Sequence, residues 1–260
     1  DLVRSRGLGD VYKRQPLESL VIGANWRAVR GVADLTDALV ALSEGVCRTS
    51  LTRLHLQRQE LNDLPAIWAI SSFVQLKTLA LPSCRISHYL VLSLCRVLLK
   101  MEDLRSLDLS GLYLDTECSN NVFQSIQELP QLVHLAFGNN YLRPADLLDF
   151  LESHKSILHN LDVNGTLPTM SEVLVNMPQM PCLLVARFLP DVSSRSSDNG
   201  MEKGLSVLQR QAPNLRELTL MAPETLSHLD VWATLLAGFK ALEVLHIRLP
   251  RCFNLHDLYD

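Results

Sequence analysis

Three residues of the types that form a hydrolase triad lie in two segments with the same local pattern. Ser106 and Asp108 stand two apart in LRSLDLSGLYL, and His134 lies in the matching part of LVHLAFGNNYL. Nucleophilic attack by a serine also needs a base held against it, donors for the oxyanion and a pocket that excludes water. Whether these side chains can catalyse a reaction therefore depends on the elements that hold them.

Metal and phosphate chemistry have weaker signals in the sequence. The histidines and cysteines lack the close pair spacing of compact metal sites, and His154 and His159 stand five apart across an expected helix end. The stretch GVADLTDA, which begins at Gly31, does not fit the GxxxxGK[ST] pattern of a phosphate-binding loop. We therefore predict no metal site and no cofactor-binding site. We also predict no catalytic set.

A repeated pattern runs through the chain. The form LxxLxLxxNxL, or a close variant, is clearest in LTRLHLQRQEL, LKTLALPSCRI, LRSLDLSGLYL, LVHLAFGNNYL and LRELTLMAPET, which begin at Leu51, Leu76, Leu104, Leu132 and Leu215. Weaker copies begin at Leu17, Leu158, Met180 and Leu242. The nine units average about 28 residues, which is long enough for a helix in each unit. This pattern resembles that of the leucine-rich repeat family.

The resemblance implies an α/β fold, an open leucine-rich repeat solenoid (horseshoe) with a parallel sheet on the concave face and helices on the convex face. Side chains alternate along a strand, so the two leucines of LxL point inward and the residue between them points outward. Segments such as PADLLDFLESHKS have apolar residues at helical spacing, with Asp, Ser, Thr or Pro near the start. We expect Asn140 to bond open backbone groups of the turn after its strand, a role that Cys84 fills less completely.

A closed eight-stranded barrel is the rival arrangement for strand–helix repeats of this length. Barrel strands fill the interior with layers of Val, Ile and Leu. The expected outward residues are instead mixed: Val21, His55, Ala80, Asp108, Ala136, Asp162, Leu184, Thr219 and His246. Such a mixture favours an open sheet with a solvated face.

An open face supplies no water-excluding pocket, so we interpret the outward polar residues as a recognition surface and the chain as no enzyme. The predicted partner-binding residues are His55, Ser106, Asp108, His134, Asn160 and Asp162. A hydrolase that uses Ser106, Asp108 and His134 is the remote alternative.

Composition limits the classes of partner and compartment. The formal net charge is −4, which argues against nucleic acid or an anionic membrane as a partner. Apolar stretches such as HYLVLSLCRVLLK are short and interrupted by charges, so no membrane span is expected. Six cysteines are scattered singly, as is typical of a reducing compartment. The sequence thus favours an intracellular protein, cytoplasmic or nuclear.

Two stretches depart from the repeat. Residues 1–15 (DLVRSRGLGDVYKRQ) share none of the pattern, and we expect an adaptor-derived or disordered leader there. Residues 191–204 (DVSSRSSDNGMEKG) are polar and predict an insertion loop. The repeat domain is then expected to cover residues 16–260 and to be truncated at both ends.

The repeats also resemble particular functional classes. Their length and cysteine content are similar to those of the ribonuclease-inhibitor class and of ubiquitin-ligase receptors. A weaker resemblance links LRSLDLSGLYL and LVHLAFGNNYL to receptors that join leucine-rich repeats to an armadillo region and dock on a cullin. This implies protein recognition on the concave face, as a ubiquitin-ligase substrate receptor or as a plain scaffold or inhibitor.

Overall fold

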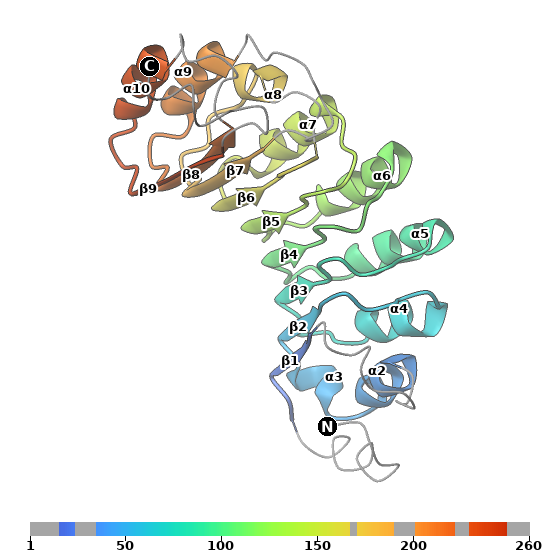
Figure 1. Ribbon diagram of the computed structural model, residues 1–260. Coiled ribbons are helices and arrows are strands. Elements are labelled where there is room, and N and C mark those ends of the chain that lie inside the picture. The colour runs from blue at the N-terminus through green and yellow to red at the C-terminus, as the bar shows by residue number, and fades with distance from the viewer. Residues whose placement is uncertain (1–15, 24–34, 167–170, 190–200, 222–228, 249–260) are drawn as a thin grey trace. The chain divides into compact units, whose positions relative to one another are not determined.

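The computed structural model describes residues 16–23, 35–166, 171–189, 201–221 and 229–248 (Figure 1). The chain divides into two compact units, Asp1–Leu132 and Val133–Asp260. The described elements of the first unit are β1 (Ser19–Ile22), α2 (Leu35–Glu44), α3 (Cys47–Ser50), β2 (Arg53–Leu56), α4 (Leu64–Ser71), β3 (Thr78–Ala80), α5 (His88–Leu98), β4 (Ser106–Asp108) and α6 (Thr116–Ile126). Those of the second unit are β5 (His134–Ala136), α7 (Pro144–His154), β6 (Asn160–Asp162), α8 (Ser171–Val175), β7 (Val185–Phe188), α9 (Met201–Gln211), β8 (Glu217–Met221), α10 (Leu229–Ala237) and β9 (Val244–Arg248).

Parallel strands form one layer of each unit and helices form the other (Figure 1). Within each unit the strands pair in chain order, β1 to β4 and β5 to β9. In neither unit does the sheet close on itself, since β1 and β9 each have a single strand neighbour. The expected α/β leucine-rich repeat solenoid, with an open parallel sheet, is confirmed, and the closed barrel is excluded.

Leucines of successive repeats are aligned across the strands. Leu54 pairs with Leu79 and Leu79 with Leu107, while Leu135 pairs with Leu161 in the second unit. All five side chains are at most 2% exposed. Each buried leucine contributes about 1.5–3 kcal/mol relative to an exposed one, so a ladder of them dominates the stability of the sheet.

Two helices, α4 and α6, begin where an aspartate side chain bonds a free backbone N–H group. The Asp63 carboxylate accepts a hydrogen bond from the Ala66 N–H (3.0 Å) at the start of α4, and Asp115 accepts one from the Cys118 N–H (2.8 Å) at the start of α6. A proline, Pro144, opens α7. These starts agree with the expectation of Asp, Ser, Thr or Pro near the beginning of each helix.

One turn position adopts left-handed backbone in successive repeats. The seventh residue after the first leucine has a positive φ in Arg58 (55°), Ser83 (57°), Gly111 (70°), Asn139 (56°) and Gly165 (67°). Glycine suits this conformation best, and a Cβ on Gly165 would lie 2.6 Å from Asn139 Oδ1. The turn geometry is therefore set by the repeat rather than by any one residue type.

The side chain of the residue after this position bonds backbone carbonyl groups in two of the strong repeats. Asn140 Nδ2 donates to the Phe137 carbonyl at 2.9 Å and to the Gly138 carbonyl at 3.4 Å. Cys84 Sγ instead donates to the Leu56 carbonyl at 3.0 Å, at the end of β2 in the preceding repeat. Asn140 thus has the expected role within its own turn, whereas the thiol, with one weak donor where an amide offers two, bonds the neighbouring repeat.

The weak repeat at Met180 is in a different register from the predicted one. Leu161 pairs with Ala186, and Asp162 pairs with Arg187, so the repeat starts at Leu183. The outward residue between the two buried ones is therefore Arg187 instead of Leu184. The sequence misled because Leu183 and Val185 imitate the LxL pair, whereas the true inward pair is Ala186 and Phe188, both 0% exposed.

The two stretches that depart from the repeat lie largely outside the described residues. This holds for the expected leader, residues 1–15, and for residues 191–200 of the expected loop. The last four loop residues instead form the first turn of α9. Gly204, which suggested a loop, allows close helix packing, because a Cβ there would lie 2.8 Å from Leu174 Cβ of α8.

Two further features concern the thiol groups and the length and apolar character of the helices. Among the described cysteines, Cys47, Cys84, Cys95, Cys118 and Cys182 are free thiols, and the first four are buried. None of the described helices has both the length and the apolar character needed to cross a membrane.

Replacing Leu107 by alanine should lower the free energy of unfolding by about 2–5 kcal/mol, because it leaves a cavity between sheet and helices. Chemical denaturation of purified protein measures this loss. The matched control is Leu92→Ala on α5, where the leucine is 53% exposed and a change below about 1 kcal/mol is expected. Equal losses at both positions would contradict the inward ladder.

Candidate functional site

The open face, defined as the sheet face opposite the helices, has two rows of side chains in the first unit. Arg53, Thr78 and Ser106 are aligned in one row, and His55, Ala80 and Asp108 in the other. Of the predicted partner-binding residues, His55, Ser106 and Asp108 are half-buried here. Ala80 is buried between His55 and Asp108, so the middle of this row carries only a methyl group.

Asp108 also has a structural task. Its Oδ1 accepts a hydrogen bond from the Ser110 N–H at 2.9 Å, and Asp162 Oδ1 accepts one from the Asn164 N–H at 3.2 Å in the second unit. An aspartate two residues before a free N–H is a common way to fix a turn. Both aspartates therefore hold the loop that leaves their strand while presenting the second oxygen on the open face.

The second unit carries a charge cluster on its open face. Arg187 of β7 lies between Asp162 of β6 and Glu217 of β8. Its Nε and Nη2 donate to Glu217 Oε1 at 3.0 and 2.7 Å, and its Nη1 donates to Asp162 Oδ2 at 3.4 Å. The bonds to Glu217 raise the pKa of Arg187 above its ordinary value, and Asp162 adds to this effect. The cluster holds one guanidinium and two carboxylates in fixed positions.

Sequence reasoning missed Arg187 as a member of the surface, and it left Glu217, an expected outward residue, out of the predicted partner-binding set. Arg187 was hidden by the register of the weak repeat, which placed Leu184 at the outward position. Glu217 stands two residues before Thr219, as Ser106 does before Asp108, so repeat alignment alone was enough to find it. Aligning this repeat from Leu183 instead of Met180 would have placed Arg187 at the outward position.

The three residues of the hydrolase alternative fall in different units. Ser106 and Asp108 belong to the first unit, and His134 begins β5 of the second. His134 pairs in register with Asn160, and its ring lies 6.1 Å from that of His159. Its Nδ1 is buried without a hydrogen-bond partner among the described residues. Burial, followed by the neighbouring His159, lowers the pKa of His134 below its ordinary value.

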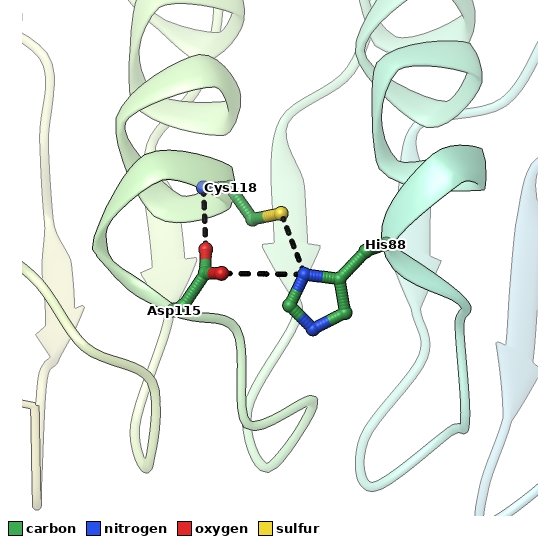
Figure 2. Close-up of side chains that lie close together, drawn as sticks. All are labelled: His88, Asp115 and Cys118. Carbon is green, nitrogen blue, oxygen red and sulfur yellow. Dashed lines mark hydrogen bonds and ion pairs between the residues drawn. The ribbon is translucent and has the colours of Figure 1, made fainter.

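A different set of reactive side chains meets at the starts of α5 and α6. Figure 2 shows the His88 ring turned with one nitrogen toward both Asp115 and Cys118. His88 Nδ1 lies 3.2 Å from Asp115 Oδ2 and 3.5 Å from Cys118 Sγ. Burial raises the pKa of the Cys118 thiol to about 11, and the Asp115 carboxylate adds to the rise. A histidine, a carboxylate and a thiol together have the composition of a metal site.

The sequence pointed to no such set, since His88 and Cys118 stand 30 residues apart and Asp115 lies between them. Adjacent repeats bring equivalent positions side by side, and all three residues lie at or next to the start of the helix in their repeat. Aligning the repeats and comparing residues at equivalent positions would therefore have revealed this group.

Comparisons with known proteins agree with the fold. No protein-family model matches the chain, and no curated protein matches it. Among solved structures, an internalin (inlF) from Listeria monocytogenes is 20% identical with a TM-score of 0.51, over 88% of this chain and 60% of that one. The chain thus spans less than two thirds of the internalin. At this identity the likeness shows the fold alone.

Two further structures are more distant. Leiomodin-1 actin-binding site 2 is 11% identical with a TM-score of 0.38, over 66% of this chain and 86% of that one. The leucine-rich repeat ectodomain of the plant membrane receptor kinase GASSHO1/SCHENGEN3 from Arabidopsis thaliana, in complex with CASPARIAN STRIP INTEGRITY FACTOR 2, is 15% identical with a TM-score of 0.36, over 82% and 31%.

The depressed pKa of His134 makes stability depend on pH. Below about pH 6.5 the unfolded chain takes up the proton first, so stability is lost as the pH falls toward the lower folded-state pKa. Chemical denaturation at about pH 7.5 and about pH 5.5 should show a smaller acid-dependent loss in His134→Gln than in the wild type. The same loss in both proteins would contradict the assignment.

Proposed function

We propose that this chain is a protein-recognition module whose partner binds the open face of the sheets. The observation that supports this most is the ordered arrangement of half-buried polar side chains on the strands, with fully buried leucines on the opposite side. Because the strands already fix these side chains, little conformational entropy is lost when a partner binds. The leucine-rich repeat fold suits such a role.

The residues we assign to the surface are the six predicted from the sequence together with two charged residues of the second unit: His55, Ser106, Asp108, His134, Asn160, Asp162, Arg187 and Glu217. In the second unit, Asp162, Arg187 and Glu217 offer a fixed pattern of charges, which favours specificity for a partner of complementary pattern. Their mutual pairing also limits the energy that any single partner charge can gain there.

An exposed aromatic residue extends the surface of the first unit toward the loops. Tyr113, between β4 and α6, is 73% exposed and has a φ of 54°. A bulky residue in this conformation is strained by about 1–2 kcal/mol. Exposed tyrosines are frequent anchors of protein interfaces. A strained tyrosine that remains this exposed supports a role in recognition.

A comparison of two surfaces tests the proposal. The double variant Ser106→Arg with Asp108→Asn adds bulk and removes a charge on the open face, while the introduced amide keeps an oxygen for the Ser110 N–H. We expect binding of a partner, captured with the full chain and then purified, to weaken at least about tenfold with an unchanged melting temperature. Asp162→Lys is less suitable, because it sets a second cation beside Arg187.

The matched control is Arg96→Glu, a charge reversal at an exposed position of α5 on the helix side. This variant should bind the partner as tightly as the wild type in the same titration. If Arg96→Glu loses binding and the open-face variant keeps it, the partner binds the helix side and the proposal is wrong.

Tyr113→Gly should raise the free energy of unfolding by about 1 kcal/mol, because glycine adopts positive φ without strain. The same substitution should weaken binding of the purified partner, since the exposed ring is lost. Denaturation and binding titration of one protein sample measure both effects. A gain in stability with unchanged affinity would remove Tyr113 from the surface.

The finer role follows from the resemblance of the repeats to ligase receptors. As a ubiquitin-ligase substrate receptor, an intracellular protein of the cytoplasm or nucleus, the chain would hold a substrate on the open face while another element docks on a cullin. A plain scaffold or inhibitor has the same surface without the docking. Co-purification of a cullin with the full-length protein, and ubiquitin transfer to the captured partner, distinguishes the two. A hydrolase remains a remote alternative, supported only by residue types.

A further inference from the structure

The group His88, Asp115 and Cys118 offers three different ligand types within a small volume. The three donor atoms lie within 4.8 Å of one another. His88 is the first residue of α5, Asp115 caps α6 and Cys118 lies in its first turn, so both adjoining repeats contribute. The site lies within the first unit, on the helix side of the strands, and is separate from the open face.

The spacing of the donors matches a tetrahedral zinc ion. Zn–N, Zn–O and Zn–S bonds of about 2.0, 2.1 and 2.3 Å place a nitrogen about 3.4 Å from the oxygen and about 3.5 Å from the sulfur. His88 Nδ1 lies 3.2 Å from Asp115 Oδ2 and 3.5 Å from Cys118 Sγ. Both separations from the nitrogen therefore suit the ion, and the oxygen and the sulfur lie within 4.8 Å of each other.

The surrounding bonds hold two of the three ligands in place. Asp115 Oδ1 accepts the Cys118 N–H at 2.8 Å, which leaves Oδ2 directed at the His88 ring (Figure 2). Cys118 is 8% exposed and is fixed by the helix that begins beside it. His88 is open to solvent, with a side chain 68% exposed, so an ion can enter from that side. Ligands fixed in this way lose little freedom when a metal binds.

We propose that His88 Nδ1, an Asp115 carboxylate oxygen and the Cys118 thiolate bind one Zn²⁺ ion, with water as the fourth ligand. The thiol proton passes to the buffer as the Zn–S bond forms, so a neutral imidazole and two anions surround the divalent ion. Sulfur and nitrogen donors favour zinc over magnesium or calcium. The bound ion links the start of α5 to the start of α6 and stabilises the first unit.

Cobalt(II) is the probe, because it occupies zinc sites and its spectrum reports ligand type and geometry. The full chain, freed of metal with a chelator, should bind one Co²⁺ with intense visible bands of tetrahedral geometry and a near-ultraviolet thiolate band. Zinc should displace the cobalt and raise the melting temperature. Cys118→Ser should abolish the thiolate band, and His88→Gln should weaken binding by at least about tenfold.

Cys182→Ser is the matched control. Cys182 is the one half-buried thiol among the described cysteines, and it donates to the Ser156 carbonyl in the second unit. Its removal should leave the spectrum and the affinity unchanged. Because His88 is exposed, His88→Gln should fold even if a Cys118 variant does not. The proposal is overturned if no tetrahedral cobalt forms, if His88→Gln binds as tightly as the wild type, or if the thiolate band depends on Cys182.

Discussion

The buried leucine ladder is the constraint on which the rest of the structure depends. A single strand–helix repeat has one apolar face and cannot cover it alone, so each repeat is stable only against its neighbours. Register therefore has to be maintained from one strand to the next, because a slip by one residue would turn the leucines outward. Leu79, which pairs with both Leu54 and Leu107, is typical: its neighbours on either side are the same residue type at the same position.

Fixed register determines what the turns can do. Each repeat leaves its strand after a pair of inward apolar residues in the same register, so successive turns adopt similar backbone geometry. This explains why Arg58, Ser83 and Asn139 accept the left-handed backbone that Gly111 and Gly165 adopt easily. It also brings the next side chain close to carbonyl groups at a strand end, which are those of its own turn for Asn140 and that of the preceding repeat for Cys84. Packing of the leucines outweighs the strain, since a buried leucine contributes more than a left-handed residue costs.

The sequence predicted the fold well wherever inward residues are leucine. Strands with an LxL pair in strong repeats or their close copies were found in the correct register, and Asn140 has the expected bonds within its turn. Prediction failed where the inward pair is unusual, as in Ala186 and Phe188, since a nearby Leu–Val pair fitted the pattern equally well. It also failed for α9, because Gly204 and polar neighbours suggest a loop unless the contact with Leu174 is known. Both errors have the same cause: a local sequence pattern does not show which residues of the neighbouring repeat pack against it.

The surface residues were harder to predict because a repeat turns sequence distance into spatial contact. Arg187 meets Asp162 and Glu217 across 25 and 30 residues, and His88 meets Cys118 across 30. Each distance is close to one repeat, so residues at equivalent positions become neighbours although no local motif joins them. A search for compact motifs therefore misses such groups, whereas a comparison column by column through the repeats finds them once the register is right. The strands align one set of positions on the open face, and the helix starts align another on the opposite side. The stacking of repeats thus forms two separate surfaces, the open face and the row of helix starts. The charged residues of either surface can change without any change in the buried leucines that support both.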